Sequence, residues 1–499
     1  MKTNVLFGLL LAALCGSCTA KKPLADAPEP VYPVPLPKQV AWQQMETYAF
    51  IHFGLNTFND KEWGYGDTDP HTFNPRKLDC EQWVRTLKEA GMKGVILSAK
   101  HHDGFCLWPF EGTEYSVKNS PWRGGKGDLV RELSDACRKY GLKLGIYLSP
   151  WDRNRADYGT PEYVAYYHAQ WKDLMTNYGP LFEVWFDGAN GGDGWYGGAK
   201  EKRTIDRKTY YNLPAIFAAL DSVQPQAVVF SDGGPGCRWT GNERGVASET
   251  NWSFLRKGVV YPGYPNADEL HTGHADGDMW AAAECDVSIR PGWFYHPEED
   301  DKVKSVEQLV DLYYRSVGRN ATLLLNFPVN RDGLIHPTDS AHAVRFYQEI
   351  SRQLAKDLLA GVVPSVSNER GEPYVAGALT DGKYDTYWAT EDSVTSATVE
   401  FRLPSVISAD CLMLQEYIPL GQRVQSFCVE CLVYGQWQPI DTGGEAMTTI
   451  GYKRLLRFKR MSISGLRVRF DKARGPLCVN NIALYDTQQV INVKDVDGK

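Results

Sequence analysis

The sequence has few of the features that mark metal-binding, disulfide-bonded or nucleic-acid-binding proteins. Nine of its 11 cysteines follow residue 18, and their one close pair, Cys428 and Cys431, has no second pair beside it. Zinc sites and disulfide frameworks need repeated pairs, so we predict neither and expect mostly buried thiols. The net charge of −7 at pH 7, without a block of like charges, argues against a nucleic-acid partner.

An apolar run lies at the N-terminus. MKTNVLFGLLLAALCGSC places Lys2 before this run and small residues after it, which is typical of a bacterial signal peptide over residues 1–20. Gly16-Ser17-Cys18 resembles a lipoprotein processing site that leaves Cys18 lipidated; cleavage after Ala20 is the alternative. We therefore expect an exported protein, in the periplasm or anchored to the outer membrane of a Gram-negative bacterium, with membrane contact only through this lipid. Residues 21–40 are interpreted as a proline-rich spacer.

The following region alternates between short β-rich runs and amphipathic stretches. Helical patterns such as CEQWVRTLKEAG and GDLVRELSDACRKYG each end in a glycine, as a helix C-cap prefers. The alternation predicts an α/β fold, a (β/α)8-like barrel over residues 41–362. The expected strands are YAFIHFG, MKGVILSAK, GLKLGIYLSP, LFEVWFDG, AVVFSDG, VASET, DVSI and ATLLLNF.

The pattern changes after this barrel. Residues 363–487 contain short alternating runs separated by turn residues, with no long helical pattern between them. ATVEFRLP, ADCLMLQEY, QSFCVECLVYG and NNIALYD are examples. We predict an antiparallel β-sandwich domain here.

Polar and aromatic side chains are dense at the predicted C-terminal ends of the barrel strands, where barrel enzymes build their active sites. The sequence also holds 15 Trp and 27 Tyr, which suits a carbohydrate partner although most of them are expected to fill the core. The residues at the strand ends are His52, Glu62, Trp63, His101, His102, Tyr147, Trp185, Asp187, Arg238 (in the loop after the fifth strand), Glu243 and Trp293.

Metal binding and glycoside hydrolysis both use such residues. Zinc is disfavoured because the adjacent His101 and His102 point in opposing directions in an extended chain, and no HxH or HxxxH spacing occurs. Structural capping of a strand end could explain one of the three histidines, His101 or His102. It does not explain why all three lie at the same rim of the barrel. Glycoside hydrolysis fits better, since it needs one carboxylate at the anomeric carbon and one carboxylic acid at the leaving oxygen.

Two carboxyl groups are candidates for these roles. Asp187 ends the apolar strand LFEVWFDG, and Glu243 lies in the glycine-flanked loop WTGNERG, which we expect to let the acid reach the leaving group. Spacing alone does not choose between Glu243 and Glu249. The other competing carboxylates are Glu62, Asp152 and Asp232.

FIHFGLNTFNDKEWGYG, AKHHDGFCLWP, GIYLSPWD and EVWFDGANG resemble signature segments of the α-L-fucosidases of glycoside hydrolase family 29. The resemblance implies a retaining exo-enzyme acting on fucosylated glycans without a cofactor, with Asp187 as nucleophile. RWTGNERG resembles the branch that prefers α-1,3- and α-1,4-linked fucose, and implies that Glu243 is the acid/base. The other residues at the strand ends are implied to bind the sugar. A glycan-binding protein that has lost catalysis, or a glycosidase for another sugar, are the alternatives.

The C-terminal domain resembles a discoidin-like carbohydrate-binding module. ALTDGKYDTYWAT matches the segment where that fold often holds a structural calcium, with Asp381 and Asp385 as oxygen ligands. A plain turn rich in Asp and Gly is an equal alternative, and the domain could also be a structural buttress for the barrel.

Overall fold

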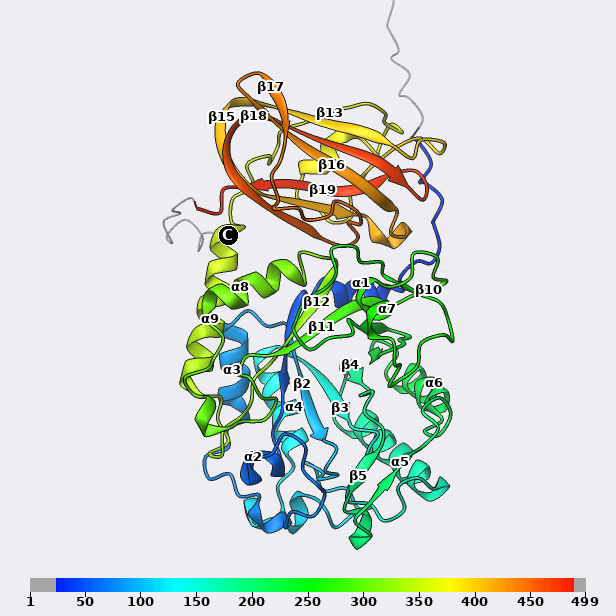
Figure 1. The fold of residues 1–499 in the computed structure, drawn as a ribbon, viewed down its shortest axis with the longest axis vertical. Helices are drawn as coiled ribbons and strands as arrows, with labels where there is room; N and C mark the ends of the chain where they lie inside the picture. The colour runs from blue at the N-terminus through cyan, green and yellow to red at the C-terminus, as the bar shows by residue number, and fades with distance from the viewer. Residues whose placement is uncertain (1–23, 489–499) are drawn as a thin grey trace, which may run out of the picture.

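Residues 24–488 are described by a computed structural model, which shows a closed parallel barrel joined to an antiparallel sheet domain (Figure 1). The predicted fold class is confirmed. The predicted signal peptide and the lipidation of Cys18 lie outside the described residues.

The barrel has eight strands in the order β1-β12-β11-β8-β7-β4-β3-β2. Every residue of β2 is buried, as its β-branched, polar-poor run predicts for a strand covered on both faces. The strands are β1 (Thr47–Ile51), β2 (Gly94–Lys100), β3 (Lys143–Leu148), β4 (Leu181–Trp185), β7 (Val228–Ser231), β8 (Cys237–Trp239), β11 (Ala282–Ser288) and β12 (Ala321–Asn326).

The helices around the barrel follow the predicted patterns. Asp79 and Asp128 cap α3 and α4 by accepting hydrogen bonds from backbone N–H groups, and Gly141 ends α4 in the left-handed conformation at φ 76°. The helices are α1 (Pro37–Gln43), α2 (Leu55–Asn59), α3 (Cys80–Glu89), α4 (Leu129–Tyr140), α5 (Pro161–Asn177), α6 (Leu213–Val223), α7 (Ala267–Thr272), α8 (Val306–Arg315) and α9 (Pro337–Gln353).

The sixth barrel strand is not the predicted one. VASET forms no strand, and β8 is the sixth barrel strand instead. Only five residues separate β8 from β7, and the two strands pair in parallel. Parallel neighbours are normally joined by a crossover helix, so a sequence pattern of alternating strands and helices passes over this connection. Gly236 permits it, because a Cβ atom there would lie 2.5 Å from the Val229 nitrogen.

The sheet domain has seven strands in the order β14-β19-β15-β18-β16-β17, with β13 paired to β15. Two predicted strands, ATVEFRLP and ADCLMLQEY, form the single strand β15, whose register shifts between Arg402 and Ile407. Pro404 lies within that break and has no N–H to donate. The strands are β13 (Ser365–Val366), β14 (Trp388–Ala389), β15 (Ala397–Glu416), β16 (Val424–Val433), β17 (Gln436–Pro439), β18 (Arg454–Ala473) and β19 (Cys478–Tyr485).

The described part of the predicted spacer is bound to the sheet domain. Arg423 and Arg474 donate hydrogen bonds of 2.8 Å to the carbonyl oxygens of Glu29 and Tyr32, and α1 begins at Pro37. The N-terminal segment therefore runs along the sheet domain before it reaches the barrel (Figure 1). The barrel and sheet domains also contact each other directly, since Glu46 forms an ion pair with Lys453.

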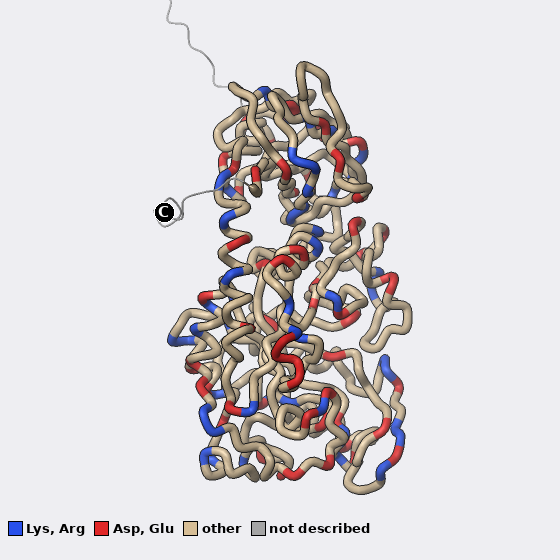
Figure 2. The backbone as a smooth tube through the Cα atoms, turned by 60° about the vertical axis from the view of Figure 1, so that its left-hand side comes forward, with Lys and Arg blue, Asp and Glu red and all other residues tan. Residues whose placement is uncertain are grey.

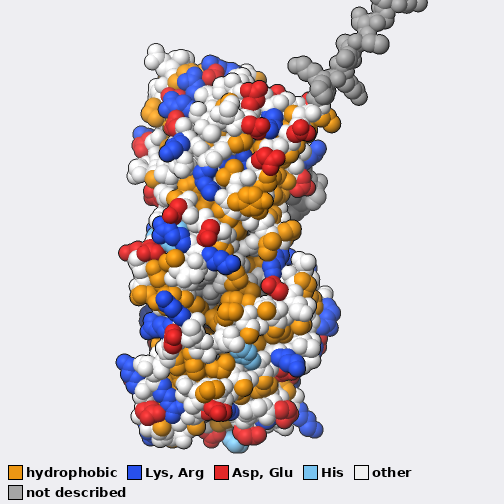
Figure 3. Space-filling model, turned by 90° about the vertical axis from the view of Figure 1, so that its right-hand side faces the viewer, with side chains coloured by type: hydrophobic (Ala, Val, Ile, Leu, Met, Phe, Trp, Pro, Cys, Tyr) orange, Lys and Arg blue, Asp and Glu red, His pale blue; other side chains and the backbone are white. Residues whose placement is uncertain are grey.

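The surface carries charges of both signs over both domains (Figure 2), with hydrophobic side chains between them on the face shown in Figure 3. Eight of the nine described cysteines are buried, as predicted, and all nine are free in the structure. Within residues 24–488, no helix combines the length and apolar character needed to cross a membrane.

The predicted calcium segment forms a turn. Asp381 accepts hydrogen bonds from the Lys383 nitrogen at 2.9 Å and from the Thr386 hydroxyl at 2.7 Å, one on each carboxylate oxygen. Both oxygens of Asp381 therefore accept a hydrogen bond within the turn. Calcium binding by Asp381 and Asp385 stays a prediction.

Candidate active site

A cavity of about 390 Å³ opens at the C-terminal ends of the barrel strands. It brings together both predicted catalytic carboxyl groups and seven of the nine residues predicted to bind the sugar; Glu62 and Arg238 do not line it. The main lining side chains are Phe50, His52, Trp63, His101, His102, Tyr147, Trp185, Asp187, Arg207, Phe230, Asp232, Trp239, Glu243, Tyr264, Asp286 and Trp293.

Asp187 lies two residues after the end of β4, and its side chain is 23% exposed. One carboxylate oxygen accepts a 2.7 Å hydrogen bond from the Ala189 nitrogen, and the other a 2.9 Å bond from the Tyr147 hydroxyl. Burial raises the pKa of Asp187, while these two bonds oppose the rise by stabilising the charged form. Both oxygens are thus held in place at the end of a rigid strand, as a nucleophile requires.

Glu243 lies on the loop after β8, at the exposed rim of the cavity. Its Oε2 accepts a 3.1 Å hydrogen bond from the indole nitrogen of Trp293. Burial raises the pKa of Glu243, the Trp293 bond lowers it, and repulsion from Asp187 raises it further, so the pKa stands above its ordinary value. An acid that retains its proton beside an ionised carboxylate is the arrangement expected of a general acid.

The loop that carries Glu243 is tightly packed, contrary to the expectation that its glycines let it swing. Gly241 and Gly245 have φ of 77° and 73°, in the left-handed region that favours glycine. A Cβ atom at Gly241 would lie 2.2 Å from the Ala267 carbonyl oxygen. These glycines therefore fix the path of the loop.

Glu249, the rival to Glu243, turns away from the cavity. Its carboxylate accepts a 2.8 Å hydrogen bond from the Ala446 nitrogen of the sheet domain, and it forms an ion pair with Arg319 at 3.4 Å. The ambiguity between the two glutamates is thereby resolved in space, with Glu243 at the cavity and Glu249 at the domain contact.

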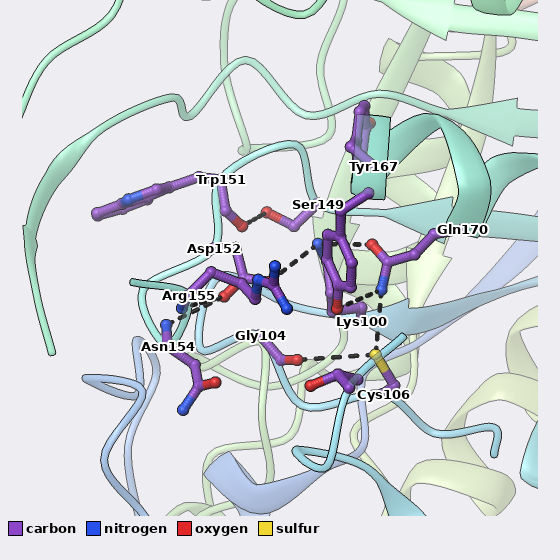
Figure 4. Close-up of polar contacts among 12 residues, drawn as sticks. Lys100, Gly104, Cys106, Ser149, Trp151, Asp152, Asn154, Arg155, Tyr167 and Gln170 are labelled. Atoms are coloured by element: carbon purple, nitrogen blue, oxygen red, sulfur yellow. Dashed lines mark hydrogen bonds and ion pairs between the residues drawn. The ribbon is translucent and has the colours of Figure 1, made fainter. Parts of the chain in front are cut away.

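Asp152 is also excluded from the cavity, because it belongs to a buried network behind it. Figure 4 shows Lys100, the last residue of β2, directed toward Asp152 and Gln170, with nitrogen–oxygen distances of 3.4 and 3.1 Å. The Ser149 hydroxyl, also drawn in Figure 4, donates a hydrogen bond to the Trp151 carbonyl oxygen. This network fixes the ends of β2 and β3, which His101, His102 and Trp151 follow in the chain.

The three histidines of the cavity are neutral. Burial lowers the pKa of His52 and of His102 to about 3, and lowers that of His101 well below its ordinary value. His52 Nδ1 bonds to Asn326 at 2.9 Å and His102 Nδ1 to Ser149 at 2.7 Å, whereas His101 Nδ1 is buried with no partner among residues 24–488. A neutral imidazole offers one donor and one acceptor, which suits sugar hydroxyls. Among the described residues, the side-chain groups close enough to share a metal ion do not include these histidines.

Glu62 anchors the rim instead of lining the cavity. It accepts hydrogen bonds from the backbone nitrogens of Trp293 at 2.8 Å and Phe294 at 3.0 Å. His296 lies between Glu62 and Asp60, at 2.7 and 2.8 Å. Glu62 therefore positions the segment that carries Trp293, and through it Glu243.

Arg238 lies in β8 and not in the loop after the fifth strand, which corrects the sequence interpretation. It is fully buried, and its guanidinium donates to the carbonyls of Leu270 and Ala281 and to the Asn251 side chain. Its hydrogen bonds are directed into the protein, so we leave Arg238 out of the sugar-binding set.

Two further buried carboxyl groups line the cavity: Asp232, which the sequence offered only as a competing carboxylate, and Asp286, which it did not indicate. Asp232 accepts a 2.7 Å hydrogen bond from the Gly263 nitrogen, and burial raises its pKa to about 7. Asp286 accepts a 2.9 Å bond from the Trp239 indole. The alternation Glu284, Asp286, Ser288 along β11 could have indicated an inward-facing acid, but the predicted strand began only at residue 286.

Comparison with known proteins agrees with this geometry. Residues 32–345 match the family model for α-L-fucosidase. α-L-fucosidase 1 of Arabidopsis thaliana is 40% identical over 485 residues, which cover 96% of this chain and 92% of that protein. A glycoside hydrolase family 29 structure from a rumen bacterium is 44% identical, with a TM-score of 0.83 over 95% of this chain and 80% of that one. A family 29 fucosidase of Ruminococcus gnavus in complex with fucose is 32% identical, with a TM-score of 0.83 over 93% of this chain and 97% of that one.

Proposed function

The chain belongs to the α-L-fucosidase family, glycoside hydrolase family 29, and we propose that it releases terminal α-L-fucose from glycans with retention of the anomeric configuration. The observation that carries the mechanism is the pair of carboxyl groups in one cavity, Asp187 deep at the end of β4 and Glu243 at the rim. Retaining glycosidases divide nucleophile and acid/base between two such groups.

In the first step, a carboxylate oxygen of Asp187 attacks the anomeric carbon of fucose. The glycosidic bond breaks, and Glu243 gives its proton to the departing oxygen. In the second step Glu243, now a carboxylate, takes a proton from water, whose oxygen attacks the anomeric carbon and frees Asp187. Two displacements restore the original anomeric configuration.

The deep part of the cavity holds the fucose ring in this proposal. His52, His101 and His102 supply donors and acceptors for hydroxyl groups, and Trp185 supplies an apolar wall by stacking on Phe230 with ring centroids 3.9 Å apart. Trp63, which is 54% exposed, stands at the opening. A cavity set into the end of the barrel, with its nucleophile at the end of β4, suits removal of a terminal sugar.

Several finer assignments rest on sequence motifs. The match of RWTGNERG supports preference for α-1,3- and α-1,4-linked fucose on branched glycans. The N-terminal pattern supports export as a lipoprotein, and the C-terminal resemblance supports a discoidin-like module. A catalytically inactive glycan-binding protein and a glycosidase for another sugar are the alternatives; the presence of both carboxyl groups in the cavity disfavours the first.

The decisive experiment is to incubate the protein with a Lewis-type oligosaccharide and to follow the first-formed anomer of released L-fucose by NMR. The α-anomer should appear first. Asp187→Ala should abolish turnover, and azide should then give a fucosyl azide of inverted configuration. Glu243→Ala should impair substrates with poor leaving groups far more than aryl fucosides.

A surface variant, Asp135→Ala, serves as the matched control because Asp135 lies on α4 and forms an exposed ion pair with Arg138. No fucose release by the wild type would refute the activity, and first appearance of the β-anomer would refute retention. Near-normal turnover by Asp187→Ala would refute the assignment of the nucleophile.

A further inference from the structure

Asp286 is a carboxyl group of the cavity that the two-carboxyl mechanism does not use. It is 2% exposed and lies two residues before the end of β11. Its Oδ1 accepts the 2.9 Å hydrogen bond from the Trp239 indole. Among the residues the structure describes, none donates a hydrogen bond to the second carboxylate oxygen, Oδ2. Asp286 therefore lines the cavity with one oxygen fixed and one available to a ligand.

The surroundings of Asp286 favour the neutral form of its carboxyl group. Burial raises its pKa well above the ordinary value, ionisation of Glu243 or Glu284 would raise it further, and the Trp239 bond lowers it. Arg207 is the one arginine or lysine among the described residues that line the cavity. With Oδ1 accepting from Trp239, the proton belongs on Oδ2, which becomes a hydrogen-bond donor.

Two buried glutamates beneath the cavity also favour the neutral form of Asp286. Glu284, two residues earlier on the same face of β11, is fully buried and accepts a 2.7 Å hydrogen bond from the Trp185 indole. Oxygens of Glu284 and of Glu183 on β4, also fully buried, lie within 4.8 Å of each other. Burial raises the pKa of both, and neither is a cation that could stabilise a charge on Asp286.

We propose that Asp286 is a third, substrate-binding carboxyl group of the site, which donates a hydrogen bond to an oxygen of the leaving-group sugar beside Glu243. The inference rests on the proposed function and adds to it a residue on the leaving-group side. Glu243 defines that side, because it protonates the departing oxygen. Asp286 keeps its own proton throughout the cycle and so contributes to recognition without entering proton transfer.

The test compares Asp286→Asn with Asp286→Leu. The Asn side chain keeps an acceptor for Trp239 and a donor in place of Oδ2, so kcat/KM for a fucosylated oligosaccharide should stay within about 3-fold of wild type. The Leu side chain removes the donor and leaves Trp239 unpaired, so kcat/KM should fall about 10- to 100-fold. On an aryl fucoside, whose leaving group lacks sugar hydroxyls, the Leu variant should lose much less.

The pH profile provides a second readout. Because Asp286 is neutral in the wild type, Asp286→Asn should leave the alkaline limb of kcat/KM where it is. If Asp286 carried a charge, its removal would lower the pKa of Glu243 and move that limb to lower pH, which would overturn the proposal. Equal losses in the Asn and Leu variants, or a Leu variant with wild-type kcat/KM on the oligosaccharide, would also overturn it.

Two controls separate this outcome from other causes. Asp301→Leu, at an exposed position between β11 and α8, should match wild type. Thermal unfolding of each variant shows whether it folds, and the Asn variant keeps the test valid if the Leu variant does not. Fucose release by wild type is measured first, so failure of the proposed function is seen before any variant is compared.

Discussion

The indole nitrogen of Trp293 lies 3.1 Å from Oε2 of Glu243 and donates a hydrogen bond to it. This contact joins the loop after β8 to the segment after β11, and Glu62 fixes that segment by accepting the Trp293 backbone N–H. The orientation of the proposed acid therefore depends on residues 50 and 181 positions away in the sequence.

Trp293→Phe keeps the aromatic ring and removes the donor. Since the Trp293 bond lowers the pKa of Glu243, its loss should raise that pKa, and the alkaline limb of kcat/KM should move to higher pH. We also expect a several-fold lower kcat on oligosaccharides, because Glu243 loses its orientation. Trp437→Phe in the sheet domain is the matched control. An unchanged alkaline limb in Trp293→Phe would show that the bond does not tune Glu243.

Glu249→Gln should separate the two neighbouring glutamates. Loss of the charged acceptor for Arg319 and the Ala446 nitrogen should weaken the contact between barrel and sheet domain and lower the melting temperature by a few degrees. The kcat/KM values of the folded protein should remain those of wild type on both aryl and oligosaccharide substrates. A selective loss on poor leaving groups would instead return Glu249 to the role of acid.

The sequence predicted those parts of the fold and site that depend on local patterns. Strand ends such as LFEVWFDG and AKHHDG place Asp187 and the histidines at the cavity, because buried parallel strands direct their last residues to one rim. Helices α3 and α4 were likewise predicted, because their sequence patterns have Asp at the start and Gly at the end.

Features that depend on distant contacts were missed. Glu243 and Glu249 are six residues apart and equally plausible in sequence, and a partner almost 200 residues away, Ala446, determines that Glu249 faces the sheet domain. Strand β8 was missed because no helix precedes it. The carbonyl groups of Leu270 and Ala281, which accept the inward hydrogen bonds of Arg238, also lie in later segments of the chain.

His296 should give the stability of the protein a pH dependence. Burial alone would lower the pKa of His296, but its bonds to Asp60 and Glu62 outweigh this and raise the pKa above the ordinary 6.5. A raised pKa in the folded state stabilises the protein fully below pH 6.5, and this stabilisation is lost as pH rises through the raised value. The difference in melting temperature between wild type and His296→Asn should therefore be largest near pH 5.5 and shrink by pH 9.

His71→Asn is the control, because His71 pairs with Asp69 at the exposed surface. Its melting temperature should follow that of wild type at every pH. Parallel curves for wild type and His296→Asn would contradict the assigned pKa direction.

Chelation should leave catalysis unchanged. The proposed chemistry is supplied by Asp187 and Glu243, and the cavity histidines are assigned to sugar hydroxyls. Dialysis against EDTA or EGTA should therefore not change kcat/KM on a small fucoside, whereas loss restored by zinc would revive the metal alternative. The predicted calcium site is tested separately: a melting temperature that calcium raises in wild type, but not in Asp381→Ala, would establish it.

Lys100→Met tests whether the network behind the cavity stabilises the ends of β2 and β3. Lys100 and Asp152 are both fully buried, so removing the cation leaves the Asp152 carboxylate without its charged partner in a region closed to water. Breaking such a pair costs about 3–5 kcal/mol in the free energy of unfolding. The double variant Lys100→Met/Asp152→Asn removes both charges and should recover part of this loss.

Lys172→Met, at an exposed position on α5, is the matched control and should change stability by no more than about 0.5 kcal/mol. Denaturant unfolding followed by tryptophan fluorescence gives the comparison. Because the network also supports the residues that carry His102 and Trp151, the KM for an aryl fucoside should rise in Lys100→Met and return toward wild type in the double variant. If the double variant were as unstable as the single one, packing of the lysine stem and not charge pairing would hold this part of the barrel together.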